Sequence, residues 1–395
     1  TWRTAGDRAL LRSDHHHARS VFQHIREMGL ARAVPDVHVQ AQVGIGNAWR
    51  ALGRPDEARQ ALQQARREAN WAQLHTVDAN ALMSLGVLDL DAGRMSAGAA
   101  RFAAAVHAYT RAGELVEASR ANANLSLALH GMGRYDEARA HAEEGISLGE
   151  RAGNASAAAS AEIARSNCWL DLGYYEYAIE CYEASLAHND EHELTHYGNI
   201  CLLNIALCNI ELGRWDAAEA TLDRLEDPNR RLVERLRSVV AFNGALIMEG
   251  RGDTDAAQRR YEASRQVRQQ LGQAPLLIDS LAGLLRTAIA TNERATMTSL
   301  LSDLESRVRD RGTFGVEHLG RLYLTMYEGH HANGDAARAK TWLSNATSLL
   351  GERANQLADP NHRNTYLIRP PAHRRIIALA LAQGLSVPSL DRASA

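Results

Sequence analysis

The sequence predicts an all-α protein, a right-handed superhelix of helical hairpins, on three observations. A motif of the form Leu-Gly-x-Tyr-x-x-Ala recurs with anchor residues at 13, 53, 93, 133, 173, 213, 252, 292 and 334, which lie 39 to 42 residues apart. Apolar residues ahead of the anchors follow helical spacing, and a small residue stands at a constant distance after most of them. Repeats of this length are typical of stacked supersecondary units, so about nine hairpins are expected.

The first helix of each unit is predicted to run up to the anchor. Its apolar residues lie on one face, as at Leu202, Ile205 and Ile210. The anchor glycine ends this helix because glycine adopts the left-handed conformation at little cost. An acidic residue such as Asp56 or Asp136 then favours the first turn of the second helix.

The second helix carries a small residue five positions after the anchor and, in most units, a large apolar or aromatic residue four positions further on. This spacing puts both residues on one face, where the small side chain lets two helices approach closely. The small residues are Ala18, Ala58, Gly98, Ala138, Ala178, Ala218, Ala257 and Ala339. Met297 fills this position in the unit anchored at Asn292, which predicts a local kink or packing defect. Each apolar face must be covered by the next hairpin.

The end of the chain departs from the period. The repeat array is predicted for residues 1–350, a capping helix region for residues 351–383 and a tail for residues 384–395. Pro370 and Pro371 suit the start of a helix. Ile376 and Ile377 are expected to cover the exposed end of the array.

The repeated motif resembles that of the tetratricopeptide repeat family, most closely at Gly53, Gly133, Gly173 and Gly213. The period exceeds the family's usual length of about 34 residues and is similar to the long repeats of bacterial regulators of the MalT-like kind. The resemblance implies that the first helices line a concave groove in which a protein or an extended peptide binds. It also implies a covalently attached effector domain in a larger signalling or transcription-regulatory protein.

Composition narrows the function further. The net charge is -3, from 44 basic and 47 acidic residues, which gives no reason to expect a nucleic-acid or anionic-membrane partner. No apolar run approaches the roughly 20 residues that cross a bilayer. Four cysteines do not form a disulfide framework, so a reducing cytoplasm is expected. Lys340 is the only lysine and alanine is abundant, which favours a GC-rich bacterial genome.

Asparagines recur at two positions of the repeat, six and nine residues before the anchor. In peptide-binding members of the resembled family, asparagines on the inner face bond the ligand backbone, because an amide can donate and accept at once. Arginines on the same helices suit a ligand carboxylate. The candidate ligand-binding residues are Asn47, Arg120, Asn124, Asn167, Asn204, Asn243, Arg286 and Arg321. The alternative is that the asparagines merely form hydrogen bonds between neighbouring helices.

One complete enzyme motif is present, the HExxH sequence from His192 to His196. On a helix this spacing places two imidazoles on one face for zinc, with Glu193 as general base. The extended zincin motif needs glycine and histidine where Asn199 and Leu202 stand. The repeat period also places the motif at a turn between units, so no catalytic residue, metal or cofactor is predicted.

The sequence therefore favours a non-enzymatic peptide- or protein-binding module, the sensor or scaffold part of a larger bacterial cytoplasmic regulator. A stand-alone peptide-pheromone receptor is the alternative. A zinc hydrolase that uses His192, Glu193 and His196 is a minor alternative.

Overall fold

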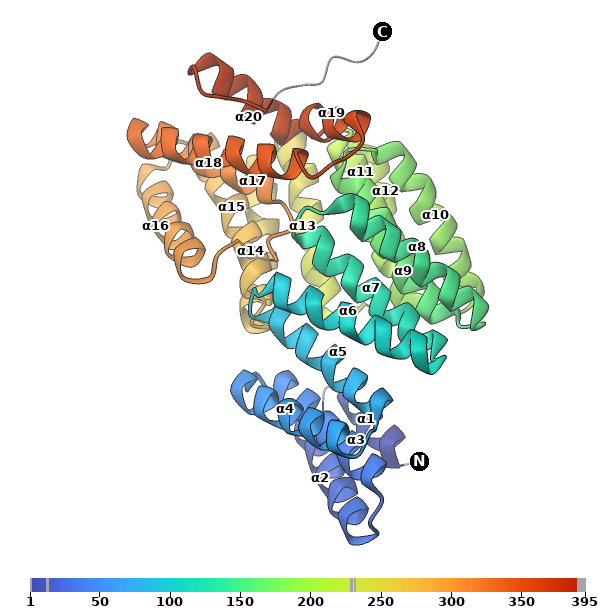
Figure 1. The fold of residues 1–395 in the computed structure, drawn as a ribbon. Helices are drawn as coiled ribbons and strands as arrows, with labels where there is room; N and C mark the ends of the chain where they lie inside the picture. Colours follow the sequence, from blue (N-terminus) through green and yellow to red (C-terminus); the bar gives the residue numbers. More distant parts are fainter. Residues whose placement is uncertain (1, 12–13, 228–229, 231, 314, 389–395) are drawn as a thin grey trace. The chain divides into compact units, whose positions relative to one another are not determined.

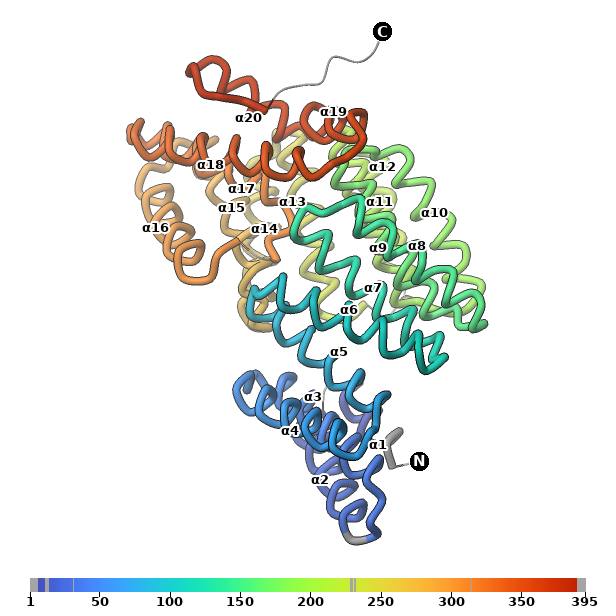
Figure 2. Tube along the Cα trace, in the orientation of Figure 1, coloured from blue at the N-terminus to red at the C-terminus, as the bar shows by residue number. Residues whose placement is uncertain are grey.

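The computed structural model describes residues 2–11, 14–227, 230, 232–313 and 315–388. All regular secondary structure in these residues is helical, with 20 α-helices and one short 3-10 segment (Figure 1). The tube in Figure 2 follows the chain from one helix to the next. The predicted all-α architecture of repeated helical hairpins is confirmed.

Within the described residues, helices α1 to α18 form nine consecutive hairpins, as the number of anchors predicted. The first four hairpins are α1 (Trp2–Leu11) with α2 (His15–Ala31), α3 (Pro35–Ala51) with α4 (Pro55–Trp71), α5 (His75–Asp91) with α6 (Met95–Ala112), and α7 (Leu115–Gly131) with α8 (Tyr135–Arg151). The other five are α9 (Ala155–Asp171) with α10 (Tyr175–Glu191), α11 (Thr195–Glu211) with α12 (Trp215–Asp223), α13 (Glu234–Gly250) with α14 (Thr254–Gln270), α15 (Ala274–Ala290) with α16 (Arg294–Arg311), and α17 (Leu319–Ala332) with α18 (Ala336–Ala354). The 3-10 segment Arg224–Glu226 extends α12, and α19 (Pro360–Ile368) and α20 (Pro371–Ala382) follow α18.

The chain divides into two compact units. The N-terminal unit comprises Thr1–Met132 and Ala140–Ala161, and the C-terminal unit comprises Gly133–Arg139 and Glu162–Ala395. Each unit has its own apolar clusters between successive hairpins. In the N-terminal unit one such cluster joins α3, α4 and α5, and in the C-terminal unit another joins α10 to α14.

Left-handed residues occupy the turns, and from position 33 to position 213 they recur every twenty residues. The residues with positive φ at these positions are Ala33, Gly53, Gln73, Gly93, Gly113, Gly133, Gly153, Gly173, Glu193 and Gly213. The anchor glycines are thus confirmed as the turns inside the hairpins. The turns between hairpins use the same conformation, which the sequence concealed because three of these five turns lack glycine. The anchor at Ser13 lies outside the described residues.

The predicted close approach of helices is confirmed. All eight small residues after the anchors are buried. Larger residues of the second helices pack against glycines of first helices, as Phe102 of α6 does against Gly86 of α5. Met297 is fully buried with Leu301 and Leu304 in one apolar cluster, so the expected packing defect in this unit is wrong. Methionine is unbranched and flexible, which lets it fill such a position.

The capping region contains two helices, α19 and α20, and the second begins at the Pro370–Pro371 pair, where a helix start was predicted. Proline has no backbone N–H and cannot continue a helix from the preceding turn. The chain therefore breaks at Pro370, and Pro371 begins α20 as the first helical residue. Ile376 is fully buried in a cluster that includes residues of α17 and α18, which agrees with its expected capping role.

The predicted tail is described only as far as residue 388. Leu385 and Val387 pack against the same cluster as α20. The backbone N–H of Leu385 donates to the carbonyl oxygen of Ala380 at 2.9 Å. Residues 389–395 lie outside the described part of the chain.

The C-terminal helices also pack against the early part of their own unit, 193 to 222 residues earlier in the chain. Arg353 Nη1 donates to the hydroxyl of Tyr135 at 3.0 Å, and the backbone N–H of Ala358 donates to Asp136 at 3.0 Å. Arg369 binds both carboxylate oxygens of Glu176 at 2.7 and 2.8 Å. These contacts explain why residues 133–139 belong to the C-terminal unit.

Across the described residues, no helix combines the length and the apolar character that a membrane span requires.

Candidate functional site

All eight predicted ligand-binding residues lie on first helices of hairpins, which are the odd-numbered helices. Asn47 is on α3, Arg120 and Asn124 are on α7, Asn167 is on α9, Asn204 is on α11, Asn243 is on α13, Arg286 is on α15 and Arg321 is on α17. Three of them belong to the N-terminal unit and five to the C-terminal unit. The repeat period therefore assigns each residue to the equivalent helix of its hairpin.

The asparagines of the C-terminal unit form an amide row across α9, α11 and α13. The Oδ1 atom of Asn167 accepts hydrogen bonds from the hydroxyl of Tyr182 and from Nδ2 of Asn204, the latter at 3.1 Å. Nδ2 of Asn243 donates to the carbonyl oxygen of Leu203 at 3.1 Å. The structure thus brings Asn167 and Asn204 together and ties Asn243 to the preceding first helix.

The members of the amide row differ in what they can offer a ligand. Asn243 is buried, whereas Asn167 and Asn204 are half-buried. Within the described residues, the Nδ2 group of Asn167 and the Oδ1 atom of Asn204 form no hydrogen bond. An extended backbone offers alternating N–H and C=O groups, and such free amide groups can pair with both.

The two arginines of the C-terminal unit are already paired with carboxylates. Arg286 Nε and Nη2 lie 2.7 and 3.0 Å from the two carboxylate oxygens of Glu249, on α13. Arg321 Nη2 lies 2.6 Å from Oε1 of Glu211, which joins α17 to α11. The side chains of Arg286 and Arg321 are 12% and 22% exposed, so both pairs are shielded but still reached by solvent.

The charge of Glu249 is stabilised by its surroundings. Burial raises the pKa of this carboxyl, but Arg286 and Arg321 together with a hydrogen bond from Tyr261 outweigh it, so the pKa lies below its ordinary value. The hydroxyl of Tyr261 also accepts from Arg286 Nη2 at 2.8 Å. A ligand carboxylate that binds Arg286 must therefore compete with an ionised glutamate.

Sequence reasoning did not include Glu211, Glu249 and Tyr261 in the site. The available signal was the position of the acids: Asp91, Asp171 and Glu211 each stand two residues before an anchor, and Glu249 stands three before. Such acids lie at the ends of first helices. The pairing of Glu211 and Glu249 with arginines of later hairpins depends on the curvature of the array.

A second cluster of ionisable side chains, which includes Asp279 and His318, lies where α17 begins. Asp279 of α15 is 3% exposed and accepts the backbone N–H groups of Glu317 and His318 at 3.0 and 3.2 Å. Burial raises the pKa of Asp279 to about 7, although Arg268 opposes this shift. Burial together with Arg321, Arg268 and Arg286 lowers the pKa of His318 to about 3. The imidazole is therefore neutral at ordinary pH.

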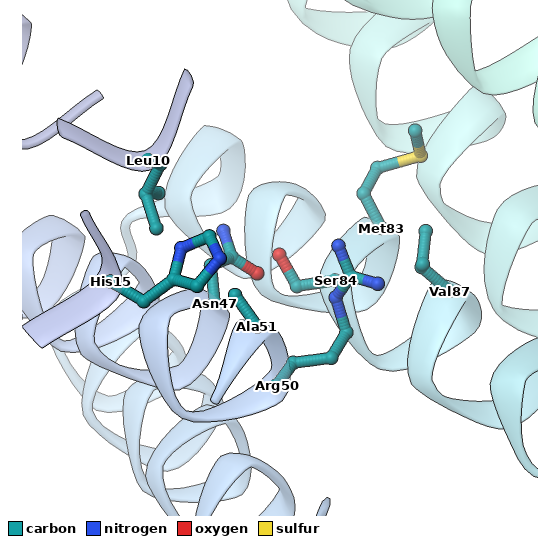
Figure 3. Close-up of a pocket in the computed structure, with 8 residues that line it drawn as sticks. All are labelled: Leu10, His15, Asn47, Arg50, Ala51, Met83, Ser84 and Val87. Atoms are coloured by element: carbon teal, nitrogen blue, oxygen red, sulfur yellow. The ribbon is translucent and has the colours of Figure 1, made fainter. Parts of the chain in front are cut away.

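The candidate residues of the N-terminal unit have fewer partners. Arg120 is exposed, and Asn47 and Asn124 are half-buried. Among the described residues, neither asparagine side chain forms a hydrogen bond. Asn47 lines a pocket of about 400 Å³ together with residues of α1, α2, α3 and α5 (Figure 3).

The HExxH motif does not lie on one helix. His192 caps the end of α10, Glu193 has a φ of 55° in the turn, and His196 belongs to α11. The two imidazoles therefore lack the one-turn helical spacing that the zinc motif needs, and the zinc-hydrolase alternative loses its geometric basis. In the described part of the chain, no group of three or more His, Cys, Asp or Glu residues is placed to hold a metal ion.

Comparison with known sequences identifies the repeats. Family models described as tetratricopeptide repeat match residues 40–69, 119–148 and 201–229, which are hairpin segments of both units. No curated protein sequence matches the chain significantly.

Several solved structures match this chain over most of its length. The apo form of RapI is 12% identical with a TM-score of 0.57, and the match covers 86% of this chain and 94% of RapI. Aspartyl phosphate phosphatase F from Bacillus subtilis is 14% identical with a TM-score of 0.55, over 90% of this chain and 94% of that one. NprR in complex with its cognate peptide NprX is 14% identical with a TM-score of 0.54, over 82% and 94%. At these identities the likeness concerns the fold.

Proposed function

We propose that the chain is a non-enzymatic binding module for an extended peptide or protein segment, which binds along the first helices. The amide row carries this proposal, because Asn167 and Asn204 keep free donor and acceptor groups on adjacent first helices. The eight candidate residues named above are the proposed contacts. The likeness of the fold to NprR, a protein solved with a bound peptide, supports it.

Binding is proposed to act by shifting the spacing of the hairpins. Arg321 and Glu211 join α17 to α11, and a ligand carboxylate that takes Arg321 breaks this connection. A ligand that binds one arrangement of hairpins better than another shifts the population toward it. In the full protein this shift is proposed to reach a covalently attached effector domain.

The setting of the module is part of the same proposal. The forty-residue period supports the long, MalT-like type of tetratricopeptide repeat, found in large bacterial regulators. The protein is proposed to act in the cytoplasm, with no nucleic acid bound by this chain. The array is proposed to span residues 1–350, with the capping region at residues 351–383 and the tail at residues 384–395.

A stand-alone peptide-pheromone receptor is the second candidate. It is favoured by the likeness of the fold to NprR, which was solved in complex with its cognate peptide. A gene that encodes a long catalytic or switch domain fused to this array would contradict it.

The direct test is native mass spectrometry of the protein purified gently from its own host. The expected result is extra mass that corresponds to a peptide and disappears on denaturation. The double variant Asn167→Ala/Asn204→Ala is expected to lose this mass because it removes the free amide groups. Asn355→Ala is the matched control, since Asn355 is an exposed amide at the end of α18.

The proposal is wrong if the native protein carries no peptide and also retains none from a random synthetic pool. Equal retention by the double variant and the control would exclude the amide row as the site. Circular dichroism of each variant establishes that the fold is intact.

A further inference from the structure

Two histidines at the end of α10 lie one helical turn apart, which puts them on the same face of the helix. The backbone N–H of His192 donates to the carbonyl oxygen of His188 at 3.2 Å, so the helical hydrogen-bond pattern is intact between them. Their imidazole rings meet edge to face, with ring centres 4.8 Å apart. The HExxH motif pairs His192 with His196 instead, but Glu193 lies between these two in the left-handed turn. The structure therefore pairs His192 with a different histidine from the one in the motif.

The ring of His188 is held by a carboxylate of α9, the first helix of the same hairpin. Nδ1 of His188 lies 3.1 Å from Oε1 of Glu162, and Ser185 Oγ donates to Oε2 of this carboxylate at 2.7 Å. The side chains of His188 and Glu162 are 29% and 15% exposed. Because a carboxylate only accepts hydrogen bonds, Nδ1 carries the hydrogen and Nε2 keeps its lone pair. Glu162 thus fixes both the tautomer and the orientation of the ring.

The other three ring nitrogens of this pair are free within the part of the chain that the structure describes. They are Nε2 of His188 and both ring nitrogens of His192, whose side chain is exposed. The neighbouring acids Glu191 and Glu193 are exposed as well, which favours the approach of a cation. An ion about 2.0–2.1 Å from a nitrogen of each ring lies about 3 Å from each ring centre, so ring centres 4.8 Å apart are within its reach.

We propose that His188 and His192 together bind one late first-row divalent cation, Cu²⁺, Ni²⁺ or Zn²⁺, with Glu162 as the positioning residue for His188. Imidazole nitrogen suits these metals, whereas Mg²⁺ and Ca²⁺ take oxygen ligands. Metal-ligating histidines usually donate their other ring N–H to a carboxylate or carbonyl group, as His188 does here. Water completes the coordination of the ion. The inference lies within the C-terminal unit and does not depend on the proposed peptide binding.

The expected size of the effects follows from the roles of the three residues. Loss of an outer partner such as Glu162 typically lowers metal affinity about 10–100-fold, so Glu162→Gln is expected to weaken binding by this factor. Replacement of either histidine leaves a single ligand, and the site is expected to be lost. Cu²⁺ is expected to bind more tightly than Ni²⁺ or Zn²⁺, because this is the general order for nitrogen ligands.

The first measurement is a titration of the full chain, prepared without an affinity tag, with Cu²⁺ and Zn²⁺ in competition with a chelator of known affinity. Mg²⁺ is the negative control. His188→Gln, His192→Gln and Glu162→Gln are compared with His196→Gln. His196 is the matched control, because it is an exposed histidine four residues beyond His192, on the other side of the turn. Thermal denaturation without metal establishes that each variant is folded.

The second measurement is hydrogen exchange with and without Zn²⁺, which reports on the site itself. A local readout is needed because the chain has another group of histidines at His15, His16 and His17. An ion that bridges one helical turn holds that turn closed, so the amides of residues 188–194 are expected to gain protection. His192→Gln is expected to abolish this gain, and His196→Gln is expected to keep it.

Support requires one Cu²⁺ or Zn²⁺ site per chain that is lost in His188→Gln and His192→Gln, weakened in Glu162→Gln and unchanged in His196→Gln. Equal loss in His196→Gln would assign the ion to the HExxH residues and would overturn the inference. Unchanged metal binding in both His188→Gln and His192→Gln, or no gain of protection at the end of α10, also overturns it. An unchanged affinity in Glu162→Gln contradicts the positioning role of Glu162.

Discussion

Individual charged residues of the C-terminal unit take their roles from neighbours on other helices. Arg286 and Arg321 were predicted to hold a ligand carboxylate, and each is paired with a glutamate of an earlier hairpin. Asp279 fixes the start of α17 through two backbone hydrogen bonds. Buried groups of this kind link the stability of the fold to pH.

The substitution Asp279→Asn is expected to change how stability depends on pH. The pKa of Asp279 is about 7 in the folded chain and about 3.9 in the unfolded chain, so the folded state binds more protons between these values. The contribution of Asp279 to the free energy of unfolding therefore falls as the pH rises from about 4 to about 7, at up to about 1.4 kcal/mol per pH unit. Asparagine does not titrate, so the variant lacks this pH-dependent contribution. It also has one hydrogen-bond acceptor where Asp279 has two, for the backbone N–H groups of Glu317 and His318.

Urea denaturation of both proteins across this pH range measures the difference. The free energy of unfolding of the variant is expected to rise relative to wild type as the pH increases. The variant must be compared with wild type at each pH because His318 and His373 change the stability of both proteins in the opposite direction. Burial lowers the pKa values of these two histidines to about 3 and about 4. Parallel curves for the two proteins would contradict the prediction.

At the scale of the helix, glycines of the first helices make room for large side chains of the second helices. A Cβ atom at Gly86 of α5 would lie 2.6 Å from the ring of Phe102, which is fully buried. This arrangement recurs where Phe22 covers Gly44 and where Tyr261 covers Gly283. The glycines therefore set the distance between helices.

Gly86→Ala is expected to destabilise the protein although alanine is the better helix former. Alanine gains about 1 kcal/mol of helix propensity over glycine. Overpacking of a filled core costs about 1–3 kcal/mol, and the buried ring of Phe102 has little room to move, so the clash outweighs the gain. Gly351→Ala in α18 is the control, because its Cβ would meet only Pro388, at 3.5 Å.

Thermal and urea denaturation of the two glycine variants provide the measurement. The control is expected to keep or raise the stability, whereas Gly86→Ala lowers it. An equal or greater stability of Gly86→Ala would show that α5 and α6 can separate at little cost.

At the scale of the molecule, the C-terminal helices connect to the start of their own unit. Tyr366 of α19 is 1% exposed, and its ring lies 5.8 Å from that of Tyr135 and 4.7 Å from that of His373. The same cluster contains Leu172 and residues of α18. One apolar cluster therefore joins segments that are more than 200 residues apart.

Tyr366→Ala is expected to destabilise the packing of residues 133–139 and residues 360–382 together. Loss of a buried aromatic side chain costs about 3–5 kcal/mol. In hydrogen exchange, residues 133–139 and 360–382 are both expected to lose protection, because each covers the other. Leu381→Ala is the control, since Leu381 of α20 is 60% exposed. Loss of protection in residues 360–382 alone would contradict this coupling.

Much of the fold was predictable from the sequence because its causes are local. The anchor glycines, the small residues after them and the helical spacing of apolar residues act within about twenty residues, and the same arrangement repeats nine times. These features predicted the hairpins and assigned all eight candidate residues to first helices. They do not extend beyond the array, where the helix start at Pro370 and Pro371 follows from proline chemistry rather than from the repeat.

The pairing of distant residues was decided only by the tertiary structure. A periodic sequence carries the same information in every unit, whereas the curvature of an array is the sum of small rotations between neighbouring hairpins. That sum brings Arg321 of α17 to Glu211 of α11 and residues 353–369 to residues 133–139 and 174–176. The helices thus follow from local chemistry, and the partners of the charged residues on the first helices follow from how the hairpins stack.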